Sequence, residues 1–254
     1  MSLPPHGRVS CSICHAGQCA GFDQTVTTEG DWRITHNPLA WGNPEAEVAV
    51  LGFSKGPTQR GALARSPHDE IAFKGGRTAL AKILHHLGLV DRPESWVVDR
   101  AISDRNGRFH FGSLIRCTVE RYDPKATEWM GTGGGMLDKF TKTPLGQQVL
   151  SNCIGAHLTE LSPMTKLVVM LGMGAGGNYV EECRRAFVAS RPRATWRQIN
   201  EVAYSDGQLT VVHTEHFKSQ GALLPNWLSG DGHPRGKLGL MAREAAKKAV
   251  GNAL

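Results

Sequence analysis

Four short apolar runs, each followed by a turn or a helical segment, constrain the fold of this chain more than any other feature. They lie at residues 48–51, 109–116, 166–171 and 209–213, and segments with helical spacing lie near 79–87, 145–161, 176–189 and 238–249. Strands that are apolar throughout and alternate with helices are typical of a parallel sheet covered on both faces. We therefore predict one α/β/α domain over residues 1–254, with a central, mainly parallel four-stranded sheet.

Two stretches interrupt this regular order. Residues 1 to about 45 contain several prolines, among them Pro4-Pro5, and are predicted to be irregular. Residues 121–144 contain the run Gly131-Thr-Gly-Gly-Gly135 and are predicted to form an insertion loop at the surface. A small hairpin is predicted from Thr195 to Asp206.

Composition and charge bound the class of protein. The chain has 29 Lys and Arg against 23 Asp and Glu, a net charge of 29 − 23 = +6, which favours a polyanionic partner such as DNA. No apolar run approaches the ~20 residues that span a bilayer, so we expect no membrane partner. The start of the chain lacks the apolar core of a signal peptide, and we expect a cytoplasmic monomer without a disulfide scaffold.

Four of the six cysteines are spaced as ligands of a metal centre. Cys11 and Cys14 form a C-x-x-C turn, Cys117 ends an apolar run, and Cys153 begins an amphipathic segment. Thiolates are the preferred ligands of iron–sulfur clusters and of zinc. We predict a 4Fe–4S cluster held by these four residues, with zinc as the alternative metal. A redox-active or inert set of cysteines is the competing interpretation, and Cys19 is close enough in sequence to replace Cys14.

The loops after the predicted strands carry the candidate binding residues, because ligands of parallel sheets bind at the carboxyl ends of the strands. Gly52 and Gly56 allow backbone amides to approach a ligand closely. His216 follows the last strand and can donate a hydrogen bond to an anionic group. Ser219 and Gln220, farther along the same loop, suit contacts with phosphates or a base.

A different reaction class is suggested by the run Gly172-Met-Gly174-Ala-Gly-Gly177, which satisfies the G-x-G-x-x-G pattern of dinucleotide-binding oxidoreductases. The pattern lies late in the chain, and the next strand does not end in an acid that could bind ribose. A tight turn between a strand and a helix is the favoured explanation. Binding of NAD(P)H, followed by fluorescence, distinguishes the two.

The order of motifs resembles the iron–sulfur-containing branch of the uracil-DNA glycosylase superfamily over about residues 11–230. The matching segments are, in order, the C-x-x-C turn, Val50-Leu-Gly-Phe-Ser-Lys-Gly-Pro57, Phe73-Lys-Gly-Gly-Arg-Thr-Ala-Leu80, Ser113-Leu-Ile-Arg-Cys117, Cys153, Leu167-Val-Val-Met-Leu-Gly172 and His216-Phe-Lys-Ser-Gln-Gly221. The resemblance implies hydrolysis of the N-glycosidic bond of uracil or a related deaminated base in DNA. The damaged nucleotide would be single-stranded or flipped out of the helix, as part of base-excision repair.

The resemblance also implies roles for individual residues. His216 would donate a hydrogen bond to the departing base, and Gln59 would position the attacking water, with Asp69 and Glu70 as alternatives. Phe53 occupies the family's catalytic position in the first loop, where the backbone amides of residues 53–56 could assist. The predicted base-binding residues are Gly52, Ser54, Phe73 and Ser113, with Phe73 stacking on the base. The predicted DNA-binding residues are Lys55, Lys218, Ser219 and Gln220.

Three departures from the family pattern leave the substrate base open. Phe53 replaces a carboxylate or asparagine, Ser113 replaces an asparagine that reads the pyrimidine edge, and Phe217 and Lys218 alter the His-Pro-Ser loop. They favour, as an alternative, a member of the superfamily that binds nucleic acid with little or no catalytic activity.

Overall fold

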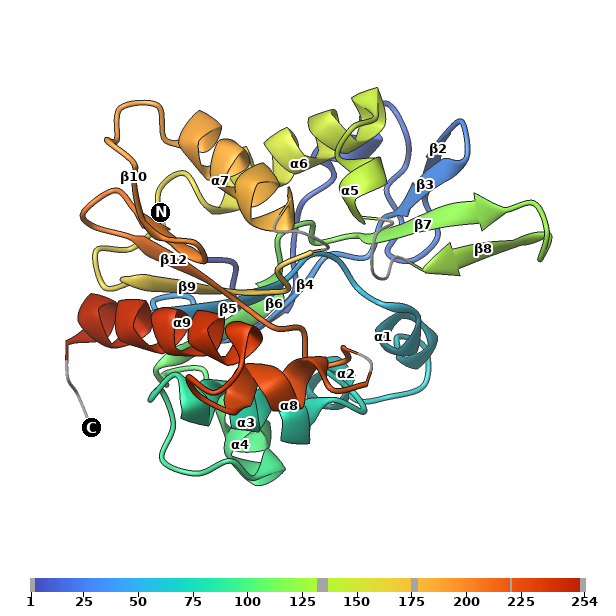
Figure 1. Cartoon of the computed structure of the whole chain (residues 1–254). Coiled ribbons are helices and arrows are strands. Elements are labelled where there is room, and N and C mark those ends of the chain that lie inside the picture. The colour runs from blue at the N-terminus through green and yellow to red at the C-terminus, as the bar shows by residue number, and fades with distance from the viewer. Residues whose placement is uncertain (1–2, 132–136, 175–177, 220, 252–254) are drawn as a thin grey trace.

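The main sheet of the computed structural model has a parallel centre. The structure describes residues 3–131, 137–174, 178–219 and 221–251. Within these residues, eight strands follow the order β1-β4-β6-β5-β9-β12-β11-β10 (Figure 1). The parallel strands are β6 (Phe109–Ser113), β5 (Val48–Gly52), β9 (Leu167–Leu171) and β12 (Thr210–Thr214). All their residues are buried, so the predicted α/β fold with a parallel centre is confirmed.

The predicted four-stranded sheet is too small. Antiparallel strands extend it at both edges, with β4 (Leu39–Gly42) and β1 (Gly7–Arg8) beyond β6, and β11 (Ala203–Ser205) and β10 (Arg197–Asn200) beyond β12. The pair β10–β11 is the predicted hairpin. By contrast, β1 and β4 lie in the segment predicted to be irregular. They are too short to show the alternation of polar and apolar residues on which a strand prediction depends.

A second, smaller sheet was not predicted. It consists of β2 (Val26–Glu29), β3 (Trp32–Thr35), β7 (Thr118–Asp123) and β8 (Glu128–Gly131), all antiparallel. The hairpin β7–β8 extends away from the rest of the molecule (Figure 1). Residues 121–131 of the predicted insertion loop are therefore partly strand, and residues 132–136 lie outside the described residues. This sheet could not be predicted from local sequence patterns, because β7 pairs with β3, which lies over 80 residues away in sequence.

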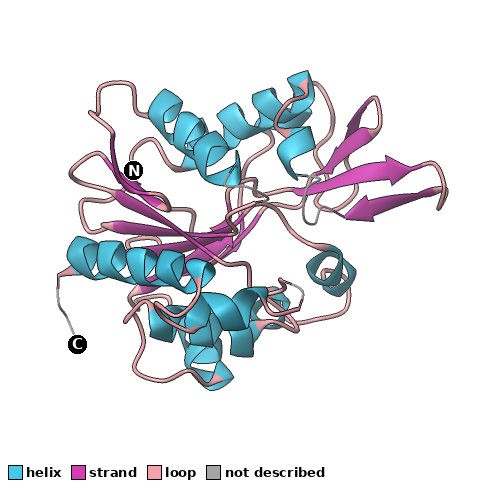
Figure 2. Cartoon of the chain, viewed as in Figure 1, coloured by secondary structure: helices cyan, strands magenta, loops and turns pink. Residues whose placement is uncertain are grey.

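Helices cover both faces of the main sheet (Figures 1 and 2). One face carries α5 (Leu137–Phe140), α6 (Pro144–His157) and α7 (Asn178–Ser190), and the other carries α3 (Arg77–His86), α4 (Ser95–Ser103), α8 (Leu223–Leu228) and α9 (Pro234–Val250). Short helices α1 (Pro57–Ala62) and α2 (His68–Ile71) lie between β5 and α3, and one 3₁₀ turn, η1 (Ile13–His15), precedes β2. None of the described helices combines the length and the apolar character needed to cross a membrane.

Local sequence sets the start of two helices. Thr143 caps α6 by accepting a hydrogen bond from the Gly146 amide at 3.0 Å, and Pro144 occupies the first turn. His233 caps α9 in the same way, with its Nδ1 3.0 Å from the Arg235 amide. The cap places the start of α9 at Pro234, four residues before the predicted start.

Candidate functional site

The carboxyl ends of β5 and β6 lie side by side at one edge of the sheet. Gly52 and Ser113 are partners in the parallel register, and both are buried. The loops beyond them stay joined, because the Leu114 amide donates to the Gly52 carbonyl at 2.7 Å and the Ile115 amide to the Phe53 carbonyl at 2.8 Å. The two predicted base-binding positions therefore belong to one rigid edge.

His216 lies two residues beyond β12, and its hydrogen bonds define its protonation. Its Nδ1 accepts the Lys218 amide hydrogen at 3.1 Å. The ring hydrogen of the neutral imidazole is thus on Nε2, for which the described residues provide no hydrogen-bond partner. Burial, and secondarily the nearby Lys218 ammonium, lowers the pKa of His216 to about 4. At neutral pH this side chain is an uncharged donor whose Nε2–H has no partner in the described part of the chain.

Phe73 lies against the histidine loop in a strained conformation. Its φ is 51°, which is unusual for a residue other than glycine. Its ring is only 4% exposed and makes edge contacts with Phe217 at 5.5 Å and with Phe111 at 5.8 Å between centroids. The structure therefore brings Phe73 next to Phe217, the residue after His216, but it also buries the ring that would stack on a base.

Phe217 has a cavity beside it. A cavity of about 590 Å³ borders Phe217, Gly75 and Gly76 at the start of α3. The Phe217 ring occupies the space where a side chain on Gly76 would lie, so this close contact requires glycine.

Two predicted roles in the first loop are corrected by burial. The Phe53 side chain is 4% exposed and packs on Phe140 and Tyr179, so it is a core residue and only its backbone can face a ligand. Lys55 is 2% exposed and donates from Nζ to the Arg116 carbonyl. Its ammonium group points into the protein and not toward a DNA phosphate at the surface.

The remaining predicted residues border the histidine loop. Lys218 is exposed and donates from Nζ to Thr58 Oγ1 at 3.0 Å, which joins the loop to α1 and its half-buried Gln59. The amide of Ser219 donates to the His216 carbonyl at 2.9 Å. Ser54 is half-buried, and Gln220 lies outside the described residues.

Glu215 is a buried acid that the sequence analysis missed. Its carboxylate accepts hydrogen bonds from the His216 amide at 3.3 Å and from Arg235 of α9, and the side chain is 8% exposed. Two neighbouring polar groups thus fix the backbone from which His216 projects. One feature of the sequence could have identified Glu215 as a site residue, because it lies directly after a predicted strand.

His213, three residues earlier, has a structural role. It is fully buried in β12, with Nδ1 3.1 Å from the Gly172 carbonyl and Nε2 3.3 Å from the Tyr204 hydroxyl. Both ring nitrogens are satisfied, and burial lowers its pKa to about 4. It cannot take over the role proposed for His216.

The four predicted cysteine ligands influence one another electrostatically. Cys14 of η1 and Cys153 of α6 share a side-chain hydrogen bond, which lowers the pKa of the Cys14 thiol to about 6 and raises that of Cys153. The pKa of Cys117 is raised to about 11, mainly by burial and with smaller contributions from Cys14 and Cys11. Three distant segments therefore converge at this point of the structure.

Backbone and side-chain donors surround the same sulfurs. The Asn37 amide bonds to Cys117, the Arg116 amide bonds to Cys153, and Asn152 Nδ2 lies 3.5 Å from the Cys14 sulfur. Such N–H groups stabilise thiolates and so suit metal ligands. By contrast, Cys19 is exposed, and Cys183 lies in α7 near Tyr204.

The surroundings of Arg116 indicate whether these residues fit an anionic metal centre. Its side chain is 2% exposed, and its Nε and Nη2 have no hydrogen-bond partner within the described residues. Burial lowers the pKa of the guanidinium to about 10, and thiolates at Cys153 and Cys11 would favour its charged form. A buried cation with unused N–H groups, facing thiols, fits a centre that carries negative charge.

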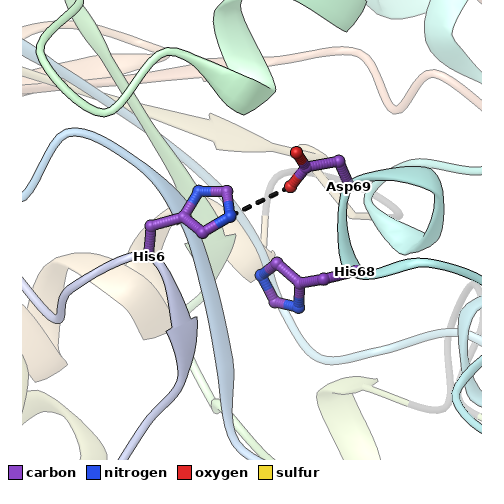
Figure 3. A group of neighbouring side chains, drawn as sticks. All are labelled: His6, His68 and Asp69. Atoms are coloured by element: carbon purple, nitrogen blue, oxygen red, sulfur yellow. Dashed lines mark ion pairs between the residues drawn. The ribbon is translucent and has the colours of Figure 1, made fainter.

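The tightest grouping of potential ligand atoms lies elsewhere. Among the described residues, only His6, His68 and Asp69 place three such atoms within 4.8 Å of one another (Figure 3). His6 Nδ1 accepts the Gly42 amide hydrogen at 3.2 Å, so Nε2 carries the ring hydrogen and faces Asp69 at 3.0 Å. A metal ion on Nε2 would move that hydrogen to Nδ1, where it would oppose the Gly42 N–H.

This group is better explained as a tether. His68 Nε2 lies 3.0 Å from the Ala40 carbonyl, and its ring stacks on Trp41. Together with the pair between His6 and Asp69, these contacts attach α2 to β4 and to the segment before β1. Asp69 is thereby engaged and is a poor candidate for positioning water, and Glu70 is exposed.

Comparison of the sequence with known proteins gives no match. No protein-family model matches the chain, and no curated protein has a similar sequence. The glycine pattern that follows β9 extends to residue 177, and residues 175–177 lie outside the described residues.

Proposed function

We propose that this protein is a DNA glycosylase that removes uracil or a related deaminated base, acting as a monomer on single-stranded DNA or on a flipped-out nucleotide. The observation that carries the proposal is the neutral His216, with a free Nε2–H at the carboxyl edge of the sheet. The resemblance of the motif order to the iron–sulfur branch of the uracil-DNA glycosylase superfamily supports it. The net charge of +6 suits a DNA partner.

The proposed reaction uses this donor where charge develops. Breaking the N-glycosidic bond leaves an oxocarbenium-like sugar and an anionic base. His216 Nε2–H donates to the base oxygen that becomes negative. The ring stays neutral because burial lowers its pKa, and the Lys218 amide on Nδ1 keeps the ring hydrogen on Nε2. Glu215 and Arg235 keep the loop in place. Gln59 of α1 is the proposed group that positions water.

Substitution of His216 tests the role of the donor. His216→Ala removes a preorganised hydrogen bond, and such losses reduce the rate by ~10²–10³. Single-turnover excision should be measured on single- and double-stranded oligonucleotides carrying uracil, hypoxanthine or xanthine. His85→Ala, at an exposed position in α3, is the matched control and should keep the wild-type rate. Equal rates for His216→Ala and wild type would refute the assignment.

We also propose a 4Fe–4S cluster at Cys11, Cys14, Cys117 and Cys153. The convergence of the cysteines from three distant segments supports the proposal, because Cys14, Cys117 and Cys153 act on one another. Zinc is the alternative metal, since it also takes four thiolate ligands. Iron and acid-labile sulfide should be measured after anaerobic purification. Stoichiometric zinc without iron would contradict the cluster.

A binding function without catalysis is the second candidate. The covered ring of Phe73, at 4% exposure, favours it, because a catalytic pocket needs an accessible face for the base. In that case the protein would bind damaged single strands in a fluorescence anisotropy assay but release no base. Excision of any of the three bases would exclude this candidate.

A further inference from the structure

Two buried cations lie beside the cysteine site. Lys55 and Arg116 are each 2% exposed, and the Lys55 ammonium donates to the Arg116 carbonyl. That carbonyl belongs to the peptide bond between Arg116 and Cys117, so the Lys55 ammonium lies beside the backbone of a predicted metal ligand. Thiolates at Cys117 and Cys153 would favour the charged form of Lys55, and thiolates at Cys153 and Cys11 would favour that of Arg116. The two cations therefore border the same thiols from two segments, the loop after β5 and the loop after β6.

Within the described residues, neither cation forms an ion pair, and the only side-chain partner of Arg116 is His110, at 3.2 Å from Nη1. Asp23 also favours the charged form of Lys55, but less than Cys117 and Cys153 would as thiolates. A buried, unpaired charge costs several kcal/mol, so proteins rarely retain one without a compensating anion.

The fold makes room for Arg116 despite this cost. Gly112 of β6 has no side chain, and a Cβ at that position would collide with Nη1 of Arg116. Its Nε and Nη2 remain unpaired. The side chain is therefore held in place beside the predicted cysteine ligands with two nitrogen atoms that have no hydrogen-bond partner in the described part of the chain.

We propose that Lys55 and Arg116 are the built-in counter-ions of the metal–thiolate centre, and that they raise its reduction potential. This inference rests on the proposed cluster. Four thiolates around an oxidised 4Fe–4S core of charge +2 give a net charge of −2, which the two cations balance. One-electron reduction adds a further negative charge, and two adjacent cations stabilise that product.

Charge-removing and charge-keeping variants test the proposal. Arg116→Met and Lys55→Met should each decrease the ratio of reduced to oxidised cluster, at a fixed potential, by about tenfold or more. Arg116→Lys and Lys55→Arg should retain most of the wild-type ratio. Arg185→Met, at an exposed position of α7, is the control. The ratio is measured by visible absorbance during anaerobic titration with dithionite, alongside iron content and the rate of iron loss to a chelator.

Thermal unfolding separates this role from ordinary packing. Without metal, Arg116→Met should be at least as stable as wild type, because a buried unpaired charge is removed. With metal, the same variant should be less stable. If wild type binds iron and the Met variants match it in potential and iron retention, the proposal is wrong while the cluster stands. If wild type binds no iron, the proposed cluster is wrong, and this inference is wrong with it. If metal-free Arg116→Met is less stable than metal-free wild type, Arg116 has a packing role and is not a counter-ion.

Discussion

The protonation of His216 gives a sharp prediction for the dependence of excision on pH. With a pKa of about 4, about 90% of the imidazole is neutral at pH 5, whereas a histidine with the ordinary value of 6.5 would be only about 3% neutral. Protonation would place a hydrogen on Nδ1 against the Lys218 amide and so disturb the loop. We therefore expect the histidine to impose no loss of rate between pH 7 and pH 5, and a steep loss near pH 4.

The assay is single-turnover excision from pH 4 to pH 8, paired with NMR titration of the His216 ring. The NMR measurement does not require activity, so it tests the pKa even if the protein only binds DNA. Lys218→Met is an informative variant, because removal of the neighbouring cation should raise the pKa of His216 slightly. A titration midpoint near 6.5 in wild type, or an acid loss of rate centred there, would refute the reasoning.

Three further predictions concern stability and the covered aromatic ring. Burial lowers the pKa of His213 to about 4, so between pH 6.5 and pH 4 the unfolded chain binds the proton more readily than the folded protein does, and the free energy of unfolding decreases as the pH is lowered. This side chain should reduce the free energy of unfolding by about 2 kcal/mol between pH 7 and pH 5. Urea unfolding of His213→Phe should show a correspondingly smaller dependence on pH. Thr143→Ala removes the cap of α6 and should lower the unfolding free energy by about 1 kcal/mol, with Thr143→Ser close to wild type; equal stability of the Ala variant would argue against the cap. Gly76→Ala should displace Phe217 and expose Phe73, which should change affinity for damaged single strands in anisotropy measurements; unchanged affinity would show that Phe73 does not contact the base.

The sequence predicts the centre of the fold well and its margins poorly. Each parallel strand is an uninterrupted apolar run, because both of its faces are buried, and such runs can be recognised without knowing their partners. The strands β1 and β4 are stabilised by pairing with a neighbour and not by their own composition. Likewise, β3 and β7 are joined by a register that links residues 32–35 to residues 118–121, which no local pattern contains.

Some features of the candidate site could likewise be predicted from the sequence, and others could not. Loops at the ends of parallel strands must meet at one edge, so Gly52, Ser113 and His216 could be predicted from topology. The burial of Lys55 could not, because a lysine in a glycine-containing loop is typically solvated. Its position depends on Arg116 and the cysteines, which come from other segments of the chain.

One short loop connects the two proposed sites. Ser113 ends β6 at the proposed base-binding edge, and Cys117, four residues later, is a ligand of the proposed metal site. The amides of Leu114 and Ile115, between them, bond to the backbone of the loop after β5. A metal centre that holds Cys117 therefore also fixes the edge at which a base would be read. Cys117→Ser should weaken binding of damaged single strands, although its side chain lies away from the base, and should do so only in protein loaded with metal. If loaded wild type and loaded Cys117→Ser bind DNA equally, the metal site and the base site are independent.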